Sequence, residues 1–424
     1  MNTTQTNCSF SLTDPQQTKT KVLNWLKRFD TFCFLDNHSY RYEPHSVECL
    51  VAAGIRGAAS QGWEGLSQFL RERQGSWLFG HLNYELKDRI HSLSSKRSDR
   101  VGFPELFFFE PQILLEIGED SMRICASDPS AVFREIEASV SMLPESPAIR
   151  FQPRISRGEY LSIIRRLKEH IHRGDCYEIN FCQEFFAENV QIDPAATYRK
   201  LSAVSPNPFS ALYRVGHCWL ICASPERFLK KEGERIVSQP VKGTAKRSAV
   251  AEEDIVRKKR LRESQKEQAE NVMVVDLVRN DFSRVCEEGS VRVDELYGIY
   301  SFPQVHQMIS TVSGMVRKGI DMRDIISACF PMGSMTGAPK RRVMQLIEEY
   351  EKTARGIFSG ALGYISPQGD FDLNVVIRSI MYNEKSGYLS FQAGSGITHY
   401  SDPELEWEEC MLKAQAIRKV FGEE

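Results

Sequence analysis

The clearest periodic pattern of apolar and polar residues in this chain begins at residue 156. Ser156 and Glu159 have the spacing of a capping box, which satisfies free backbone N–H groups where a helix starts. Apolar residues then recur at alternating spacings of four and three, which places them on one helix face: Tyr160, Ile164, Leu167 and Ile171. With Gly174 as a stop signal, the pattern predicts an amphipathic helix between Ser156 and Gly174.

The following segment alternates with a period of two. Apolar residues at 177, 179 and 181 are separated by Glu178, Asn180 and Cys182, so a strand here would place Glu178 on the face opposite the apolar residues. Further strands are predicted at Cys218–Ala223, Arg235–Val241, Gly360–Ile365, Phe371–Met381 and Tyr388–Ala393. Further helices are predicted at Ala251–Val278, Met322–Phe330, Lys340–Tyr350 and Pro403–Phe421.

These strands and helices come in runs and do not alternate strictly, which favours an α+β fold with largely antiparallel sheets. Before residue 150, apolar runs such as Trp77–Gly80 and Pro104–Ile117 look like strands, and no chemical motif occurs there. The looser stretch Pro144–Pro153 precedes a denser pattern. We therefore expect an N-terminal subdomain of residues 1–150, which contributes strands and helices to a shared fold, and a catalytic domain of residues 151–424.

Composition narrows the class of protein. Hydrophobic residues make up 42% and charged residues 26% of the 424 residues, which is near the average for soluble globular proteins. A net charge of −2 argues against binding to nucleic acid or to an anionic membrane, because both draw on clustered positive charge. The basic run Arg257–Arg260 has no interleaved aromatic residue and lies beside acidic residues, so we expect it to be a solvated helix face.

Cysteine usage and the chain's N-terminal residues indicate a compartment. Eleven cysteines without a Cys-x-x-Cys pair suit neither a disulfide framework nor a structural zinc site, and they fit a reducing cytoplasm. Met1–Pro15 lacks the basic start and apolar core of a signal peptide, and no apolar run approaches the roughly 20 residues of a membrane span. A soluble, cytoplasmic protein is therefore expected.

Carboxylates recur at metal-binding spacing in two of the predicted helices. Glu263, Glu267 and Glu270 share one face of the first, and Glu406 and Glu409 share one face of the last, because residues three, four or seven apart do so. Charged residues on helices are by default solvated, so this pattern gains weight only from its neighbours. Convergent carboxylates suit Mg²⁺, which takes one or two of them beside waters and an anionic substrate.

Four further segments could contribute to a site. The glycine-rich turns Pro331–Lys340 and Ala393–Ile397 could bring backbone N–H groups close to an anion, although neither matches a phosphate-binding fingerprint and each alone is more often a simple turn. Ser224–Glu226 and Pro240–Thr244 each end a predicted strand. Lys242 in the latter could reach a cleft where burial lowers its pKa toward a nucleophilic amine; an exposed turn lysine is the alternative.

Together these segments resemble the chorismate-utilising enzymes, the family that includes the anthranilate, aminodeoxychorismate, isochorismate and salicylate synthases. The resemblance covers residues 150–424 and rests on motifs in a fixed order: Gly174–Gln183, Ser224–Glu226, Pro240–Thr244, Ala269–Asp281, Gly333–Lys340, Ile377–Arg378, Ala393–Ile397 and Glu406–Lys413. It implies a large interleaved α+β fold, in which two mostly antiparallel sheets form a β-sandwich core flanked by helices. Residues 1–150 match the family only in general character.

The resemblance also implies roles for individual residues. Glu270 and Glu409 would hold Mg²⁺ against the ring carboxylate of chorismate, with Glu267 and Glu406 in support. Glu226 would be the general acid that protonates the departing 4-hydroxyl group. The donors to the substrate carboxylates would be Thr244, Arg378 and the segment Gly394, Ser395 and Gly396. This set suits chorismate, because a small dianion with a poor leaving group needs a cation, oriented donors and a proton source.

Position 242 separates branches of this family. Anthranilate synthases carry alanine there, whereas Lys242 resembles the aminodeoxychorismate synthases, in which this lysine adds covalently at C2 before ammonia enters at C4. Isochorismate and salicylate synthases carry a water-activating lysine at position 178, and Glu178 cannot act in the same way. The resemblance therefore implies amination of chorismate with ammonia to 4-amino-4-deoxychorismate, for 4-aminobenzoate and folate biosynthesis. Anthranilate synthase component I is the alternative.

Two positions depart from the family pattern. Gln307 stands where relatives have a histidine, and His306 stands one place earlier; Gln307 can still hydrogen-bond to the substrate but cannot take a proton. Glu178 replaces the glutamine that is more common in the aminating enzymes, so its charge must be compensated. Near Phe34–Asp36 the Leu-Leu-Glu-Ser signature of tryptophan feedback is not evident, and such control is not expected.

Ammonia must reach this site from outside the chain. No cysteine lies in a nucleophile-elbow context followed by the histidine and glutamate of an amidotransferase, so we expect a glutamine amidotransferase subunit, component II, as a partner. A non-catalytic regulatory protein on the same scaffold is disfavoured, because Glu226, Glu270 and Glu409 are all present.

Overall fold

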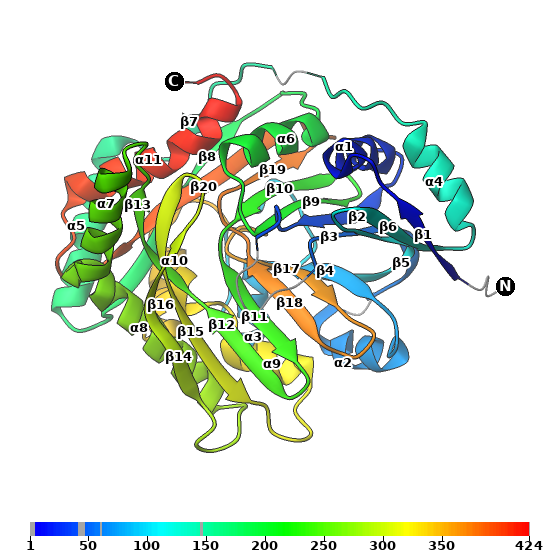
Figure 1. The fold of residues 1–424 in the computed structure, drawn as a ribbon. Helices are drawn as coiled ribbons and strands as arrows, with labels where there is room; N and C mark the ends of the chain where they lie inside the picture. Colours follow the sequence, from blue (N-terminus) through cyan, green and yellow to red (C-terminus); the bar gives the residue numbers. More distant parts are fainter. Residues whose placement is uncertain (1–4, 41–46, 60–61, 145–146, 424) are drawn as a thin grey trace.

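The computed structural model describes residues 5–40, 47–59, 62–144 and 147–423. In these ranges eleven α-helices surround twenty strands, and every pairing between strands is antiparallel (Figure 1). The predicted α+β fold with largely antiparallel sheets is therefore confirmed.

The strands form two layers that are joined at the long strand β5 (Leu106–Ile117). The strands of the first layer pair in this order: β15 (Val305–Met315), β12 (Arg235–Gln239), β11 (Arg227–Glu232), β18 (Phe371–Val375), β17 (Ala361–Ile365) and β4 (Leu78–Leu82). β13 (Val241–Lys246) continues β12 along the same edge of β15, and β14 (Arg292–Ser301) pairs with the other edge. β4 pairs with β5 and so connects the layers.

The second layer begins at β5 and contains the longer run of strands. They pair in this order: β3 (Cys49–Ala58), β2 (Thr31–Asp36), β9 (Phe209–Val215), β10 (Cys218–Ser224), β19 (Ser379–Asn383), β20 (Tyr388–Ile397) and β8 (Glu178–Ala187). Strands at its ends are β6 (Ser121–Ala126) and β1 (Thr6–Ser11) beyond β5, and β7 (Gln152–Pro153) and β16 (Gly337–Ala338) beside β8. Strands of residues 1–150 pair directly with later ones, β2 with β9 and β4 with β17.

The second layer is buried on both faces. In β10, Leu220 and Cys222 belong to the hydrophobic cluster between the layers, whereas Trp219 and Ile221 belong to the cluster on the outer face. Successive strand residues point to opposite faces, so a strand buried on both sides must be apolar throughout. This explains the unbroken apolar run at 218–223 that predicted the strand.

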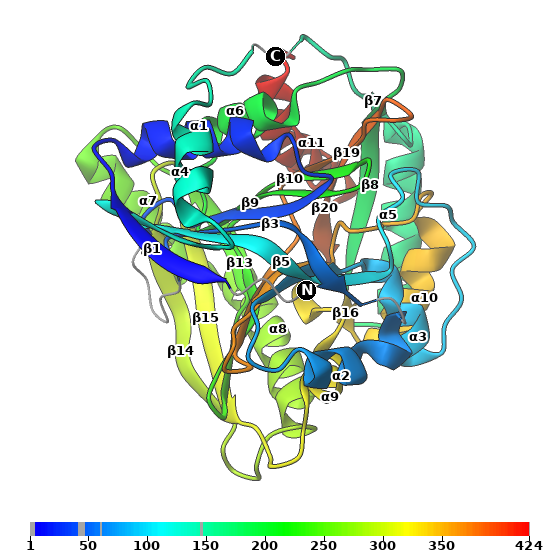
Figure 2. The ribbon, with the colours of Figure 1, turned by 90° about the vertical axis from the view of Figure 1, so that its right-hand side faces the viewer.

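Helices cover the outer face of the second layer, as Figure 2 shows for α1, α6 and α11. The helices that contribute to the outer cluster are α1 (Pro15–Leu26), α4 (Pro129–Glu137), α5 (Arg157–His172), α6 (Pro194–Val204), α10 (Lys340–Tyr350) and α11 (Pro403–Val420). The remaining helices are α2 (Gly62–Glu72), α3 (Lys87–His91), α7 (Ala251–Glu263), α8 (Gln265–Ser283) and α9 (Met322–Cys329), with the 3-10 turns η1 (Tyr84–Leu86) and η2 (Gly333–Met335). In the described ranges, no helix combines the length and apolar character needed to cross a membrane.

Most predicted elements are confirmed, and two needed correction. α5 begins after Ser156, whose side chain accepts a hydrogen bond from the Glu159 N–H as the capping pattern predicted. The helix expected at 251–278 is two helices, because Ser264 is extended and its side chain caps α8 instead. The strand expected at 371–381 is also two strands, because Arg378 has a φ of 50°, a left-handed conformation that a strand cannot contain.

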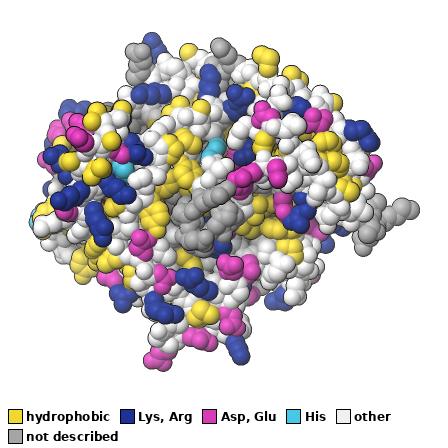
Figure 3. Space-filling view, viewed as in Figure 1, with side chains coloured by type: hydrophobic (Ala, Val, Ile, Leu, Met, Phe, Trp, Pro, Cys, Tyr) yellow, Lys and Arg dark blue, Asp and Glu magenta, His cyan; other side chains and the backbone are white. Residues whose placement is uncertain are grey.

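The basic run of residues 257–260 lies on α7, where it is largely exposed. Arg257 pairs with Glu253 on the same helix at 3.3 Å. On the face that Figure 3 shows, lysine and arginine side chains are interspersed with aspartate and glutamate. This arrangement fits the predicted solvated helix face.

Candidate active site

The motif segments meet around the start of β8. β20 pairs with β8, so that Gly396 lies opposite Asn180 and Gly394 opposite Cys182. On the other side, β16 places Gly337 opposite Ile179. Segments that are far apart in the sequence thus surround the first residues of one strand.

Glycine is required at two of these positions because the neighbouring backbone is too close for a side chain, and at a third, Gly396, a side chain would crowd two charged groups. A Cβ at Gly394 would lie 1.9 Å from the carbonyl oxygen of Phe181, and one at Gly337 would lie 2.0 Å from that of Glu178. A Cβ at Gly396 would lie 2.7 Å from Glu178 Oε1 and 3.1 Å from Lys242 Nζ. The glycines therefore shape the space around one ion pair.

That ion pair joins Lys242 on β13 to Glu178 on β8. Lys242 Nζ donates a hydrogen bond to Glu178 Oε1 at 2.8 Å, and the two side chains are 11% and 2% exposed. The charge of Glu178 is thus compensated by Lys242. Two further carboxylates, Glu270 and Glu226, also act electrostatically on Lys242.

The pKa of Lys242 departs from the sequence-based expectation. Burial alone lowers it, as expected, but the carboxylates of Glu178, Glu270 and Glu226 outweigh burial and raise it above its ordinary value. The expectation of a nucleophilic amine produced by burial was therefore wrong. In this state the lysine is a charged ammonium group held by its partner.

Glu226 lies on the turn after β10 and is 3% exposed. Burial raises its pKa to about 7, although Ser334, Lys242, the Val241 N–H and Arg378 each lower it. A carboxyl group with this pKa is substantially protonated at neutral pH and can donate its proton. This environment suits the general acid that the sequence predicted.

The four glutamates of the predicted metal site lie on two helices, α8 and α11. All four act electrostatically on the side chain of Lys266. Burial lowers the pKa of Lys266, but Glu270, Glu406, Glu409 and Glu267 together raise it. Lys266 Nζ lies 3.9 Å from Glu270 Oε1. The structure therefore brings the four predicted carboxylates into one electrostatic group.

Burial affects these carboxylates differently. It raises the pKa of Glu270 to about 7, with Glu178 and Glu267 adding to the effect. It also raises the pKa of Glu267. At Glu409, burial is outweighed by Lys413, which lies 2.8 Å away, and the pKa is lowered. On α8, burial thus outweighs the effect of the lysines that favour the charged carboxylates.

Glu263 does not belong to this group. The break at Ser264 places Glu263 at the end of α7, where its side chain is 64% exposed and faces Lys259 at 3.8 Å. The expected alignment of Glu263 with Glu267 and Glu270 on one helix was therefore wrong.

The predicted substrate donors differ in their surroundings. Ser395 donates a hydrogen bond to Glu406 Oε2 at 2.5 Å, and Arg378 lies close enough to Glu226 to affect its pKa. Thr244 is exposed on β13 and pairs in the backbone register with Gln307 on β15. Gln307 is fully buried, yet neither its amide oxygen nor its nitrogen has a hydrogen-bond partner. Such a group is available to a ligand.

His306 is engaged elsewhere. Its Nε2 lies 3.1 Å from Asp254 Oδ1 on α7 and its Nδ1 lies 2.9 Å from Ser301 Oγ, so both ring nitrogens have partners. Neighbouring strand residues face opposite sides, so His306 and Gln307 point away from each other. His306 therefore links β15 to α7 through its contact with Asp254.

Comparison with known proteins shows the family to which the chain belongs. A sequence model for the chorismate binding enzymes matches residues 14–419. The chain belongs to this family. Anthranilate synthase component 1 of Thermus thermophilus is 34% identical over 355 residues, which are 80% of this chain and 76% of that protein. Aminodeoxychorismate synthase component 1 of Klebsiella aerogenes is 33% identical over 343 residues, covering 80% and 75%.

A solved structure supports the same fold for this chorismate-binding enzyme. Anthranilate synthase component I from Streptococcus pneumoniae superimposes with a TM-score of 0.75 at 22% identity, covering 99% of this chain and 93% of that one. The expected anthranilate synthase-like fold is thus confirmed. Relatives named for the two amination reactions are equally similar, so overall identity does not choose between them.

The residues of this chorismate-binding enzyme fit a magnesium ion in charge and ligand type. Glu267, Glu270, Glu406 and Glu409 offer the oxygen ligands that Mg²⁺ prefers, and burial raises the pKa of two of them, Glu267 and Glu270. In the described residues, no three histidine, cysteine or acidic side chains are yet close enough to hold an ion. Lys266 and Lys413 contact Glu270 and Glu409 instead.

Two residues that contact parts of the candidate site were not predicted from the sequence. Lys266 directly precedes Glu267 in a predicted helix, and its position one turn before Glu270 was an available signal. Arg355 is buried and donates to the carbonyl oxygens of Met335 and Asn180 at 2.6 and 2.8 Å, which ties η2 to β8. No local pattern around Arg355 indicates this long-range contact.

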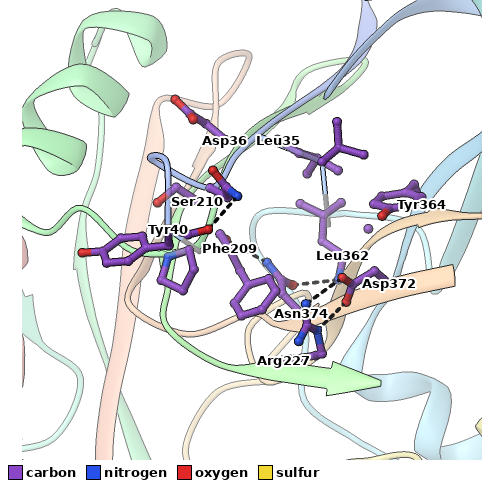
Figure 4. Close-up of a pocket in the computed structure, with 14 residues that line it drawn as sticks. Leu35, Asp36, Tyr40, Phe209, Ser210, Arg227, Leu362, Tyr364, Asp372 and Asn374 are labelled. Carbon is purple, nitrogen blue, oxygen red and sulfur yellow. Dashed lines mark hydrogen bonds and ion pairs between the residues drawn. The ribbon is translucent and has the colours of Figure 1, made fainter. Parts of the chain in front are cut away.

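A separate pocket lies between β2 and the first layer, and Figure 4 shows Asp36, Tyr40, Phe209 and Asn374 among its lining residues. It encloses about 60 Å³, far less than the several hundred Å³ usual for a ligand site. Asp36 is held by Lys19 at 2.8 Å. The predicted catalytic residues do not line this pocket.

Proposed function

We propose that this enzyme aminates chorismate with ammonia to 4-amino-4-deoxychorismate, the precursor of 4-aminobenzoate for folate biosynthesis. One observation carries the proposal: Lys242 lies inside the site, beside Gly396 and within electrostatic reach of the acid Glu226. The family resemblance implies that anthranilate synthases, to which this chain is similar overall, carry alanine at that position. An amine at this place can occupy C2 and so leave C4 for ammonia.

In this reaction the site residues have separate roles as nucleophile, general acid and substrate-binding groups. Lys242 adds to C2 of the ring while Glu226 gives its proton to the departing 4-hydroxyl group, which leaves as water. Ammonia then adds at C4, and the lysine leaves C2. The groups that orient the two substrate carboxylates are Thr244, Gln307, Arg378, Gly394, Ser395 and Gly396.

The proposal includes Mg²⁺ as the cofactor. Glu270 and Glu409 would hold it, with Glu267 and Glu406 beside them, once the two lysines that contact these carboxylates give way. When bound, the ion supplies positive charge that binds the ring carboxylate and stabilises charge developing on the substrate.

A glutamine amidotransferase subunit is the proposed source of ammonia. The relatives named component 1 carry that name as one part of a larger enzyme. The chain itself has no recognisable glutaminase segment. Free ammonium ion should therefore support turnover by this chain alone, whereas glutamine should require the second subunit.

The proposal is tested by replacing Lys242 and identifying the product. Lys242→Ala should lose most of the 4-amino product and, with abundant ammonia, allow some amination at C2. Lys242→Arg should not rescue, because a guanidinium stays protonated and is a poor nucleophile. Products of both variants and of the wild type are separated by chromatography and identified by mass. Unchanged 4-amino product from Lys242→Ala would exclude Lys242 as the covalent nucleophile, because amination at C4 would then proceed without it.

A further inference from the structure

The proposed function leaves one chemical requirement unmet. Lys242 must attack carbon through the lone pair of its amine, but in the resting site its Nζ donates a hydrogen bond to Glu178 in a buried ion pair at 2.8 Å. The 11% exposure of its side chain leaves little access for a solvent base. A base inside the site must therefore take the proton as the bond to C2 forms.

Several carboxylates face Lys242 from different elements. Glu178 lies on β8, Glu226 on the turn after β10, Glu267 and Glu270 on α8 and Glu409 on α11, and each of them interacts electrostatically with the lysine. Among the described residues, only Glu178 is in hydrogen-bond contact with Nζ, at 2.8 Å. Glu226 must keep its own proton for the leaving hydroxyl group.

Glu178 also has unused capacity to accept a proton. Its Oε1 is bound to Lys242, while its Oε2 is buried without a hydrogen-bond partner. An ionised carboxylate can accept several hydrogen bonds, and leaving one oxygen buried and unsatisfied is costly. A cost of this kind is common at functional sites. Gly396 leaves room for the pair, because a Cβ there would lie 2.7 Å from Glu178 Oε1 and 3.1 Å from Lys242 Nζ, so that the pair would have to shift.

We propose that Glu178 is the catalytic base that takes the proton from Lys242 as the lysine adds to chorismate. The inference rests on the proposed covalent step and adds a named proton acceptor to it. An amide at position 178 could not take a proton, so the step depends on the carboxylate of Glu178.

The steps balance without any added reactant. Glu178 takes one proton from the Lys242 ammonium group, the amine bonds to C2, the two ring double bonds shift, and the C4–O bond breaks. Glu226 gives its proton to the departing oxygen, which leaves as water. Ammonia then bonds to C4, the double bonds shift back, and the C2–N bond breaks to release Lys242. The new C4 ammonium group returns a proton to Glu226, and protonated Glu178 returns its proton to Lys242.

The test measures formation of the covalent adduct in Glu178→Gln. Enzyme, chorismate and Mg²⁺ are mixed without ammonia, quenched at intervals and analysed by intact-protein mass at a series of pH values. At pH 7 the variant should form the adduct about 100-fold more slowly than the wild type, the usual scale of general base catalysis. As pH rises toward about 10, the ordinary range of a lysine, loss of the Glu226 proton slows both enzymes alike. The ratio of the wild-type rate to the variant rate should nevertheless shrink, because a growing fraction of Lys242 is then already unprotonated and needs no base.

Two further variants separate a chemical role from a structural one. Glu178→Asp keeps a carboxylate and should form the adduct faster at pH 7 than Glu178→Gln. Glu184→Gln removes another buried carboxylate from the same strand, one paired with Arg154 at 2.8 Å and remote from Lys242 in the pairing pattern, and should retain the wild-type pH profile. A merely structural loss in Glu178→Gln would lower the rate equally at every pH.

The possible outcomes separate the role of Glu178 from the proposed covalent step on which that role rests. Equal adduct rates and equal pH profiles for wild type and Glu178→Gln would overturn the role of Glu178 and leave the covalent step standing. A uniform loss at all pH values would also overturn it. No adduct on the wild type would remove the covalent step and, with it, this inference.

Discussion

At the scale of single residues, buried charge decides what each group can do. Lys242 and Glu226 are both buried, but burial dominates only at Glu226, whose pKa rises to about 7. At Lys242 the neighbouring carboxylates outweigh burial, and the lysine stays charged. The acid is therefore ready to donate in the resting enzyme, whereas the nucleophile must first lose a proton.

The pKa of Glu226 leads to a pH-dependence prediction. A general acid acts only when protonated, so kcat/KM should fall as pH rises through about 7, the pKa of Glu226 in the free enzyme. Glu226→Gln cannot donate a proton and should lower kcat by about 10²–10⁴-fold. Steady-state kinetics over pH check both statements. A variant that folds normally and keeps wild-type kcat would exclude Glu226 as the acid.

The types of the site residues could be predicted from the sequence, but their partners could not. The motifs around Glu226, Lys242 and Glu270 indicated an acid, an amine and a metal ligand. The contact between Lys242 and Glu178 joins residues 64 positions apart on strands that are not neighbours in any local pattern. Because this contact was not foreseen, the net shift of the Lys242 pKa was predicted with the wrong sign.

At the scale of elements, close chain packing and helix breaks position the site. The strand and helix patterns that have a strong period, such as α5 and α10, were predicted almost to the residue. The breaks at Ser264 and Arg378 were missed, because a cap within a charged helix and a left-handed residue between strands leave the apolar pattern intact. Ser264 directly precedes the helix that carries Glu267 and Glu270, and Arg378 is itself a predicted site residue.

The close approach of β16 to β8 gives a prediction at Gly337. Gly337→Ala should push β16 from β8, because its Cβ would lie 2.0 Å from the Glu178 carbonyl oxygen and its φ of 141° disfavours a side chain. Overpacking of this kind costs about 1–3 kcal/mol of unfolding free energy, and activity should fall as well. Gly158→Ala, at a helical glycine with open space around it, is the control. Denaturant unfolding curves that coincide for wild type and Gly337→Ala would contradict the packing.

The two acidic helices give a prediction for magnesium. Glu270→Gln and Glu409→Gln should each weaken Mg²⁺ binding by at least about tenfold, because each removes a charged oxygen ligand. Glu263→Gln is the matched control, since the break at Ser264 places Glu263 outside the group with an exposed side chain. Isothermal titration with Mg²⁺ measures the effect without catalysis. Equal affinities for all three variants would exclude the proposed ligands.

At the scale of the whole molecule, the two joined layers bring distant motifs to one place. The apolar patterns predicted the α+β class, and the family resemblance predicted the interleaved arrangement. The order of strand pairing, such as β2 beside β9 and β4 beside β17, depends on contacts across the full chain and is not encoded in any local window. The site is a product of this long-range pairing.

The whole account depends on which ring carbon receives the nitrogen. The purified enzyme is incubated with chorismate, Mg²⁺ and ¹⁵N-labelled ammonium ion, and the labelled position in the product is determined by nuclear magnetic resonance. We predict 4-amino-4-deoxychorismate with the label on C4. Anthranilate, or any product with the label on C2, would contradict the assignment and identify the anthranilate synthase reaction instead.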